Sequence, residues 1–194
     1  MNKRNAVIAF AALILIAAGI YFLYPRETPK PQFGGAKDQP CPGETIEIEN
    51  PDGHLGTIAK KGQKLKITLN WYACNPLERD ALVYYRFSST LDPIVRIVRA
   101  VPGDKFKVVR DEKRGAWNLE VNGALIMNED GKDPYFFGGK PPATLSLYEK
   151  QSKGVLGNGD VIMFAAIAPG QNDSGIFGVA NVVDIVGRVE PVPQ

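Results

Sequence analysis

The chain has 194 residues, enough for one folded domain with further segments at its ends. Its 23 lysines and arginines nearly balance 21 aspartates and glutamates, and the formal net charge of +2 gives no electrostatic reason to expect a nucleic-acid partner. His54 is the single histidine, which argues against a histidine-based metal site, and no pattern indicates a metal or another cofactor.

The N-terminus predicts attachment to a membrane. Residues 1–5 are a short basic cytoplasmic end, and residues 6–24 are uncharged and apolar. As a helix this run extends over about 28 Å, enough to cross a bilayer core. Lys3 and Arg4 orient it with the N-terminus in the cytoplasm. The alternative is a cleaved secretory signal, although the run exceeds the usual apolar region of about 7–15 residues. We expect a single-pass anchor in the inner (cytoplasmic) membrane.

Residues 25–43 are a proline- and glycine-rich tether, and residues 44–194 form the domain that we place in the periplasm or outside the cell. Cys41 and Cys74 lie in this exported part, where thiols oxidise. The even count favours a Cys41–Cys74 disulfide, and two free buried cysteines are the alternative.

The domain reads as a series of short β-strands. Apolar and polar residues alternate, and turn signals such as Asn122-Gly123, typical of a type I′ hairpin, separate the runs. The strands are predicted at 45–49, 65–69, 81–87, 94–101, 106–110, 117–121, 124–127, 144–148, 161–166, 176–180 and 182–189. The predicted fold class is therefore mostly β, a folded β-sheet or barrel-like domain preceded by one N-terminal transmembrane helix.

One strand and its following turn resemble a known catalytic motif. Arg96 to Val101 followed by Pro102-Gly103-Asp104 is similar to the segment that carries the lysine general base in type I signal peptidases (leader peptidases). Further segments match the family in order and spacing: 79–86, 119–123, 159–177 and 185–189. The resemblance implies the signal-peptidase fold over nearly the whole domain.

The same resemblance implies that the catalytic dyad is missing. Gly53 stands where the family has its serine nucleophile, and Arg96 stands where it has its lysine. An arginine stays protonated at working pH and a glycine has no hydroxyl, so no acyl-enzyme can form by this route. Gln171 and Gly175 also replace the serine and arginine that support the dyad.

Asp173 and Ser174 persist from the family motif, either as a relic of the site or as a polar pair that orders a loop by local hydrogen bonds. Arg96 is expected to face the relic cleft, where it pairs with a carboxylate or binds an acidic peptide terminus. A surface arginine is the alternative.

Other residues near position 53 offer a groove or a substitute chemistry. His54, Leu55 and Thr57 are candidates for a peptide groove. Thr57, Ser88 or Ser89 could act as a nucleophile with His54 as base, but a solvated loop histidine is the simpler interpretation.

The sequence therefore predicts a membrane-anchored pseudoenzyme that binds an exported peptide or a pilin-type subunit, or that associates with an active signal peptidase. The alternative is a divergent, active membrane serine endopeptidase that removes signal peptides or matures pilin-type subunits. A purely structural envelope protein is a third class. An open groove beside Gly53 and Arg96 would favour peptide binding, and a filled one would favour a structural role.

Overall fold

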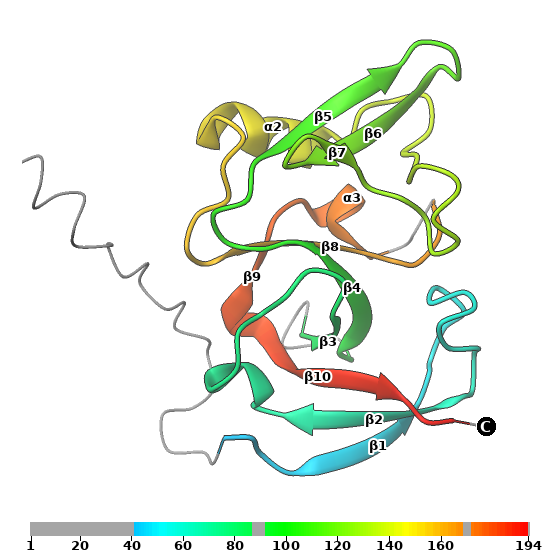
Figure 1. Ribbon diagram of the computed structural model, residues 1–194, viewed down its shortest axis with the longest axis vertical. Helices are drawn as coiled ribbons and strands as arrows, with labels where there is room; N and C mark the ends of the chain where they lie inside the picture. Colours follow the sequence, from blue (N-terminus) through cyan, green and yellow to red (C-terminus); the bar gives the residue numbers. More distant parts are fainter. Residues whose placement is uncertain (1–40, 87–91, 169–171, 194) are drawn as a thin grey trace, which may run out of the picture. The chain divides into compact units, whose positions relative to one another are not determined.

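The computed structural model describes residues 41–86, 92–168 and 172–193, which form mostly β-structure (Figure 1). The predicted span at 6–24, the tether before Cys41, and Ser88, Ser89 and Gln171 lie outside these residues. Within the described part, no helix has the length and apolar character needed to cross a membrane.

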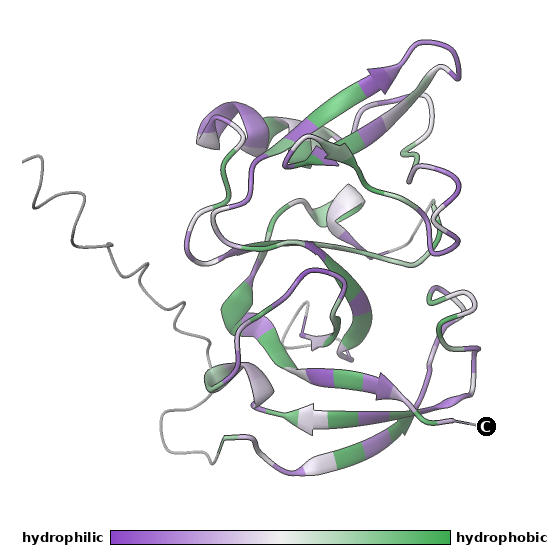
Figure 2. Ribbon diagram, viewed as in Figure 1, coloured by the Kyte–Doolittle hydropathy of each residue, from purple (hydrophilic) through white to green (hydrophobic). Residues whose placement is uncertain are grey.

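The larger sheet has seven antiparallel strands. In spatial order they are β1 (Thr45–Glu49), β2 (Lys64–Leu69), β10 (Ile185–Pro191), β3 (Leu82–Tyr85), β4 (Ile94–Ala100), β8 (Asp160–Phe164) and β9 (Ala180–Asn181). The last strand of the chain lies between β2 and β3. Along β1, β2 and β10, hydrophobic and hydrophilic residues alternate (Figure 2), which matches the period of two in a half-buried strand.

The smaller sheet is a meander of β5 (Phe106–Asp111), β6 (Ala116–Val121) and β7 (Ala124–Leu125). The predicted hairpin at Asn122-Gly123 is confirmed, because Val121 pairs with Ala124 across this two-residue loop. Asn122 has φ 52° and Gly123 has φ 84°, the positive values that a type I′ turn requires at both central positions.

Three predicted strands are wrong in whole or in part. Residues 144–148 belong to helix α2 (Ala143–Ser152), residues 176–180 include the end of the short helix α3 (Ser174–Phe177), and residues 182–184 form the 3₁₀ turn η2 (Val182–Asp184). Along 144–148, polar and apolar residues alternate as they would in a strand, but only Leu145 of α2 is buried. The helix therefore buries one apolar side chain, and hydrogen bonds of Thr144 and Glu149 add to its attachment. It carries no amphipathic stripe that the sequence could reveal.

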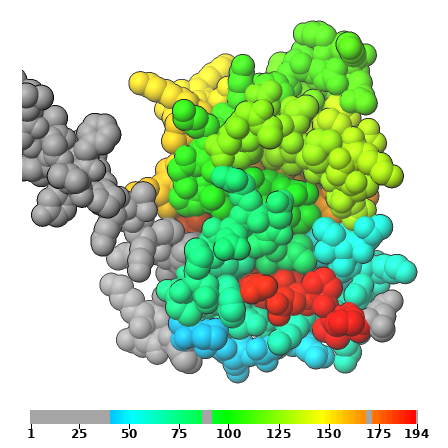
Figure 3. All heavy atoms as spheres, viewed as in Figure 1, coloured from blue at the N-terminus to red at the C-terminus, as the bar shows by residue number. Residues whose placement is uncertain are grey.

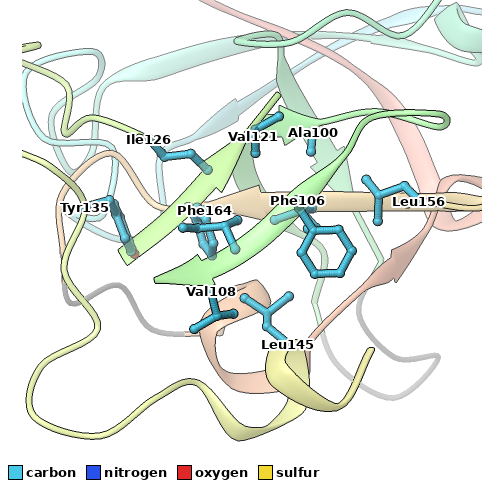
Figure 4. Close-up of a cluster of buried hydrophobic side chains, with 11 residues drawn as sticks. Ala100, Phe106, Val108, Val121, Ile126, Tyr135, Leu145, Leu156 and Phe164 are labelled. Carbon is cyan, nitrogen blue, oxygen red and sulfur yellow. The ribbon is translucent and has the colours of Figure 1, made fainter. Parts of the chain in front are cut away.

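Buried side chains form three clusters, of which the largest fills the space between the smaller sheet, α2 and β8. Figure 4 shows Phe106 and Val108 from β5, Leu145 from α2 and Phe164 from β8 pointing toward one another. The second cluster joins β3, β4, β8 and β9. The third lies beneath the loop between β1 and β2, where Leu65, Ile67 and Val95 contribute to it.

The predicted disulfide between Cys41 and Cys74 is confirmed, with the two Cα atoms 5.9 Å apart. Cys74 directly follows the 3₁₀ turn η1 (Trp71–Ala73). The two cysteines are 33 residues apart in the chain. On the loop-entropy model a crosslink of this span contributes about 3–4 kcal/mol to stability.

Candidate functional site

The loop between β1 and β2 holds Gly53, and side chains on both sides of it fix the loop to the domain. Asn50 is buried and donates its amide to the backbone oxygen of Ala59 over 2.8 Å. Leu55 and Ala59 are fully buried in the third core cluster. Leu55 therefore belongs to the core beneath the loop and does not line an open groove, in contrast to the expectation from the sequence.

Position 53 itself is open. A Cβ atom built on Gly53 would have no heavy atom within 4 Å beyond its own chain neighbours. Gly53 also has no positive φ that would demand a glycine. A serine would fit at this position, so packing does not explain why it is a glycine.

Arg96 on β4 points toward this loop and is almost completely buried, with 1% of its side chain exposed. Its Nη1 donates to the backbone oxygen of Val95 over 2.6 Å and lies 3.4 Å from Oδ2 of Asp52. Its Nε donates to the backbone oxygen of Asn172 over 3.3 Å. Arg96 is thus a buried, paired cation that links β4 to Asp52 and Asn172. The alternative of a surface arginine is excluded.

Asp52 and His54 flank Gly53 and form a pair of their own. Oδ1 of Asp52 accepts the backbone N–H of His54 over 2.9 Å, and Oδ2 lies 3.1 Å from the His54 Nδ1. The Arg96 Nη2 is 3.5 Å from the same Nδ1. Since an arginine only donates and the carboxylate is nearer, we assign the proton to Nδ1, where it faces Asp52. Nε2 then carries the lone pair on a ring that is 32% exposed.

Thr57 hydrogen-bonds to Glu129, a residue that the sequence analysis did not identify. Both its backbone N–H and its hydroxyl donate to Oε2 of Glu129, over 2.6 Å and 3.0 Å. A Cβ on Gly56, which has φ +56°, would collide with the Glu129 carboxylate. The backbone angle of Gly56 favours glycine, whereas the end of the flexible Glu129 side chain would have to move to admit a larger residue. No hydroxyl in the described part of the chain hydrogen-bonds to His54 in this arrangement.

Asp173 and Ser174 act on the backbone. Ser174 Oγ accepts the N–H of Met163 over 3.0 Å, and Asp173 Oδ2 accepts that of Ala165 over 3.3 Å. Asp173 also accepts the Tyr135 hydroxyl over 2.6 Å and begins α3 as its N-cap. The two side chains thus accept backbone N–H groups of β8 and of the residue after it that are not paired with a neighbouring strand. This agrees with the interpretation that Asp173 and Ser174 order a loop by local hydrogen bonds.

The sequence resemblance aligns Gly175 with a supporting arginine of signal peptidases, and the space around Gly175 is restricted. A Cβ at this position would lie 3.0 Å from Asp173 Oδ1 and 3.1 Å from a ring carbon of Phe137. A long side chain would have to displace both neighbours. The structure therefore has no ready place for such an arginine.

The structure brings some of the predicted site residues together and separates others. Gly53, His54 and Arg96 come together, joined by Asp52, and Thr57 turns to Glu129. Asp52 could have been noticed from its place directly before Gly53. Glu129 and Tyr135 left no signal, because their partners are 72 and 38 residues away in the chain.

Chemically, this arrangement does not support a serine–lysine reaction. Gly53 has no hydroxyl, and Arg96 is a permanent cation already bonded to protein oxygens. The space beside Arg96 is filled, whereas the space beside Gly53 is open.

No protein-family model and no curated protein matches the chain. Among solved structures, it is similar to a signal peptidase I from Enterococcus faecalis V583, with 15% sequence identity, coverage of 59% of this chain and 97% of that chain, and a TM-score of 0.40. A likeness at this level says nothing about activity, and the chemistry of the site has to come from the chain's own residues.

Proposed function

We propose that this chain is a membrane-anchored, signal-peptidase-like protein that lacks peptidase activity and binds extended segments of exported proteins. The observation that carries the proposal is the open Gly53 beside the buried Arg96, the two residues that the sequence resemblance aligns with the catalytic dyad. The guanidinium cannot release a proton at working pH, and it is held by Asp52 and two backbone oxygens.

The open surface at Gly53 supports the binding part of the proposal. No side chain fills the space over Gly53, and the partly exposed His54 borders it. An extended segment of a pre-protein or of a pilin-type subunit is the proposed ligand of this exposed loop. An active signal peptidase is a further candidate partner. No cofactor takes part in this function.

The experiment uses the full-length protein in detergent micelles and a pre-protein with its signal peptide intact. We expect the pre-protein to be retained on the immobilised protein without being cut. The same protein without its signal peptide is the matched control and should wash through. Cleavage of the pre-protein, or equal behaviour of the two forms, would contradict the proposal.

A divergent endopeptidase is the second candidate, and the Asp52–His54 pair favours it. A histidine whose Nδ1 faces a carboxylate presents Nε2 as a general base, the arrangement that activates hydroxyl nucleophiles. If the protein cuts the pre-protein and His54→Ala abolishes the cut, this function replaces the first. Thr57→Ala and Ser88→Ala would then identify the nucleophile.

A further inference from the structure

A groove lies away from Gly53, where β3 and β10 separate. β10 stays paired with β2 up to Pro191, but its pairing with β3 ends at Arg188 opposite Val83. The chain before β3 follows β4 instead, since the Asp80 N–H donates to the Val98 oxygen over 2.7 Å. The split leaves a groove of about 420 Å³ between η1, the segment 76–82 and the end of β10. In Figure 3 the end of β10 (red) reaches the surface beside this teal-to-green part of the chain.

Aromatic and proline side chains line part of the groove. The Arg188 guanidinium lies 4.9 Å from the centre of the Trp71 ring. Burial raises the pKa of Tyr72 to about 12, against a lowering by Arg188, so its phenol stays neutral at physiological pH. Pro76 and Pro191 add two rings to the lining. Tyr72 is almost completely buried, so Trp71 is the aromatic side chain that is partly exposed in this groove. An aromatic side chain beside proline rings is a surface that binds extended, proline-rich peptides in the polyproline II conformation.

Pro191 also decides between two modes of peptide binding. A peptide that joins a sheet as an extra strand needs backbone N–H groups from the strand beside it. Pro191 has none to donate. Contacts through side chains, as in polyproline recognition, therefore fit this groove better than strand addition.

The charges in the groove favour a basic ligand. Asp80 is paired with Arg99 over 2.6 Å, and Glu190 with Arg188 over 3.1 Å. Glu78 is exposed and has no ion-pair partner within the described residues. A lysine or arginine of a bound peptide would complement this carboxylate.

We propose that this groove binds an extended, proline-containing peptide whose lysine or arginine side chain pairs with Glu78. The inference rests on the proposed function for the kind of ligand, an exported segment, but it names a surface other than the one at Gly53. The dyad-equivalent residues take no part in it.

The test measures the fluorescence of Trp71 in the full-length protein in detergent micelles. The chain has two tryptophans, so Trp117→Phe leaves Trp71 as the reporter and Trp71→Phe leaves Trp117. The probe is a synthetic ten-residue peptide of alternating proline and lysine, and a peptide of alternating proline and glutamate is its control. We expect a saturable change in emission with the basic probe in the Trp117→Phe protein and no change in the Trp71→Phe protein.

Glu78→Gln supplies the charge test, and Glu112→Gln, at an exposed glutamate of the β5–β6 turn, is its matched control. We expect Glu78→Gln to weaken binding of the basic probe up to about five-fold and Glu112→Gln to leave it unchanged. An unresponsive Trp71, equal effects of the two variants, or equal binding of the acidic peptide would overturn the inference.

The two proposals fail separately. If the pre-protein is retained but Trp71 does not respond to the probe, the groove inference is wrong and the proposed function stands. If Trp71 responds with the expected charge dependence but the pre-protein is not retained, the groove inference stands and the proposed function is wrong.

Discussion

At the scale of single residues, Arg96 shows how a buried charge is stabilised inside the fold. A buried cation is tolerated only when hydrogen bonds and an opposite charge replace its water. Asp52 and the backbone oxygens of Val95 and Asn172 do this. The sequence predicted that Arg96 faces the Gly53 loop, but Asp52 as its partner could not be read from a pattern, since the two residues are 44 positions apart.

Removal of the guanidinium should therefore destabilise the protein. We expect Arg96→Ala to lower the free energy of unfolding by about 3 kcal/mol, because it removes the buried guanidinium that neutralises Asp52 and donates to the backbone oxygens of Val95 and Asn172. Arg110→Ala, at an arginine that is half exposed and paired with Glu112, should cost less than about 1 kcal/mol. Urea unfolding of the two variants measures the difference, and equal losses would refute a structural role for Arg96.

Gly53 and Gly56 should respond in opposite ways to the same substitution. Gly53→Ser places its side chain in open space and should change the free energy of unfolding by less than about 0.5 kcal/mol. Gly56→Ser meets both a positive φ and the Glu129 carboxylate, and should cost about 2 kcal/mol or more. The same urea measurement applies, and a costly Gly53→Ser would mean that position 53 is not open.

At the scale of elements, the turn between β4 and β5 is held by a buried carboxylate. Asp104 accepts two hydrogen bonds from Arg79, over 2.8 and 2.7 Å, together with the Val101 N–H and the Asn122 amide, each over 2.9 Å. Burial raises the pKa of Asp104, but these hydrogen bonds together lower it more, and the net pKa lies below the usual 3.8. The turn signal at Pro102-Gly103-Asp104 was readable from the sequence, whereas the Arg79 clamp was not.

This lowered pKa predicts an acid-dependent loss of stability. The carboxylate's contribution is fully present above the unfolded-state pKa of about 4 and is lost as the pH falls through the lower folded-state pKa. The difference in unfolding free energy between the unmodified protein and Asp104→Asn should therefore be constant near neutral pH and shrink below about pH 4. Urea unfolding as a function of pH measures it, and a difference that grows on acidification would contradict the assignment.

The sequence predicted strands well both where burial alternates, as in β1 and β2, and where the strand is buried almost throughout, as in β4 and β8. β1, β2, β6 and the hairpin after β6 follow from their patterns and turn residues. The helices α2 and α3 were missed for a physical reason. α2 buries a single leucine and is otherwise attached by hydrogen bonds of Thr144 and Glu149, and α3 is four residues long and begins at the Asp173 cap. In both cases tertiary contacts outweigh a local pattern that favours a strand.

At the scale of the whole molecule, the described part of the chain combines a seven-stranded sheet, an additional meander and a disulfide. The edge strand β1 carries Glu47 and Glu49 on its exposed side, which discourages pairing with another chain along that edge. The disulfide supports an oxidising compartment, in keeping with the proposed export.

The proposed topology has its own test. Lys3 and Arg4 ahead of the apolar run 6–24 predict an integral protein with residues 25–194 outside the cytoplasm. After alkaline carbonate extraction the protein should stay in the membrane fraction, and protease added to intact spheroplasts should digest the C-terminal domain. Release of the protein by carbonate, or protection of the domain, would contradict an anchored and exported chain.

The central claim is that Gly53 and Arg96 together remove peptidase activity. The most direct measurement is the rate at which the unmodified full-length protein cuts a pre-protein, set beside an active signal peptidase at equal concentration. We predict a rate at background, and only traces of activity after Gly53→Ser and Arg96→Lys are combined, because dyad residues act as a unit and Gly175 leaves the lysine unsupported. Cleavage by the unmodified protein well above background would contradict the claim.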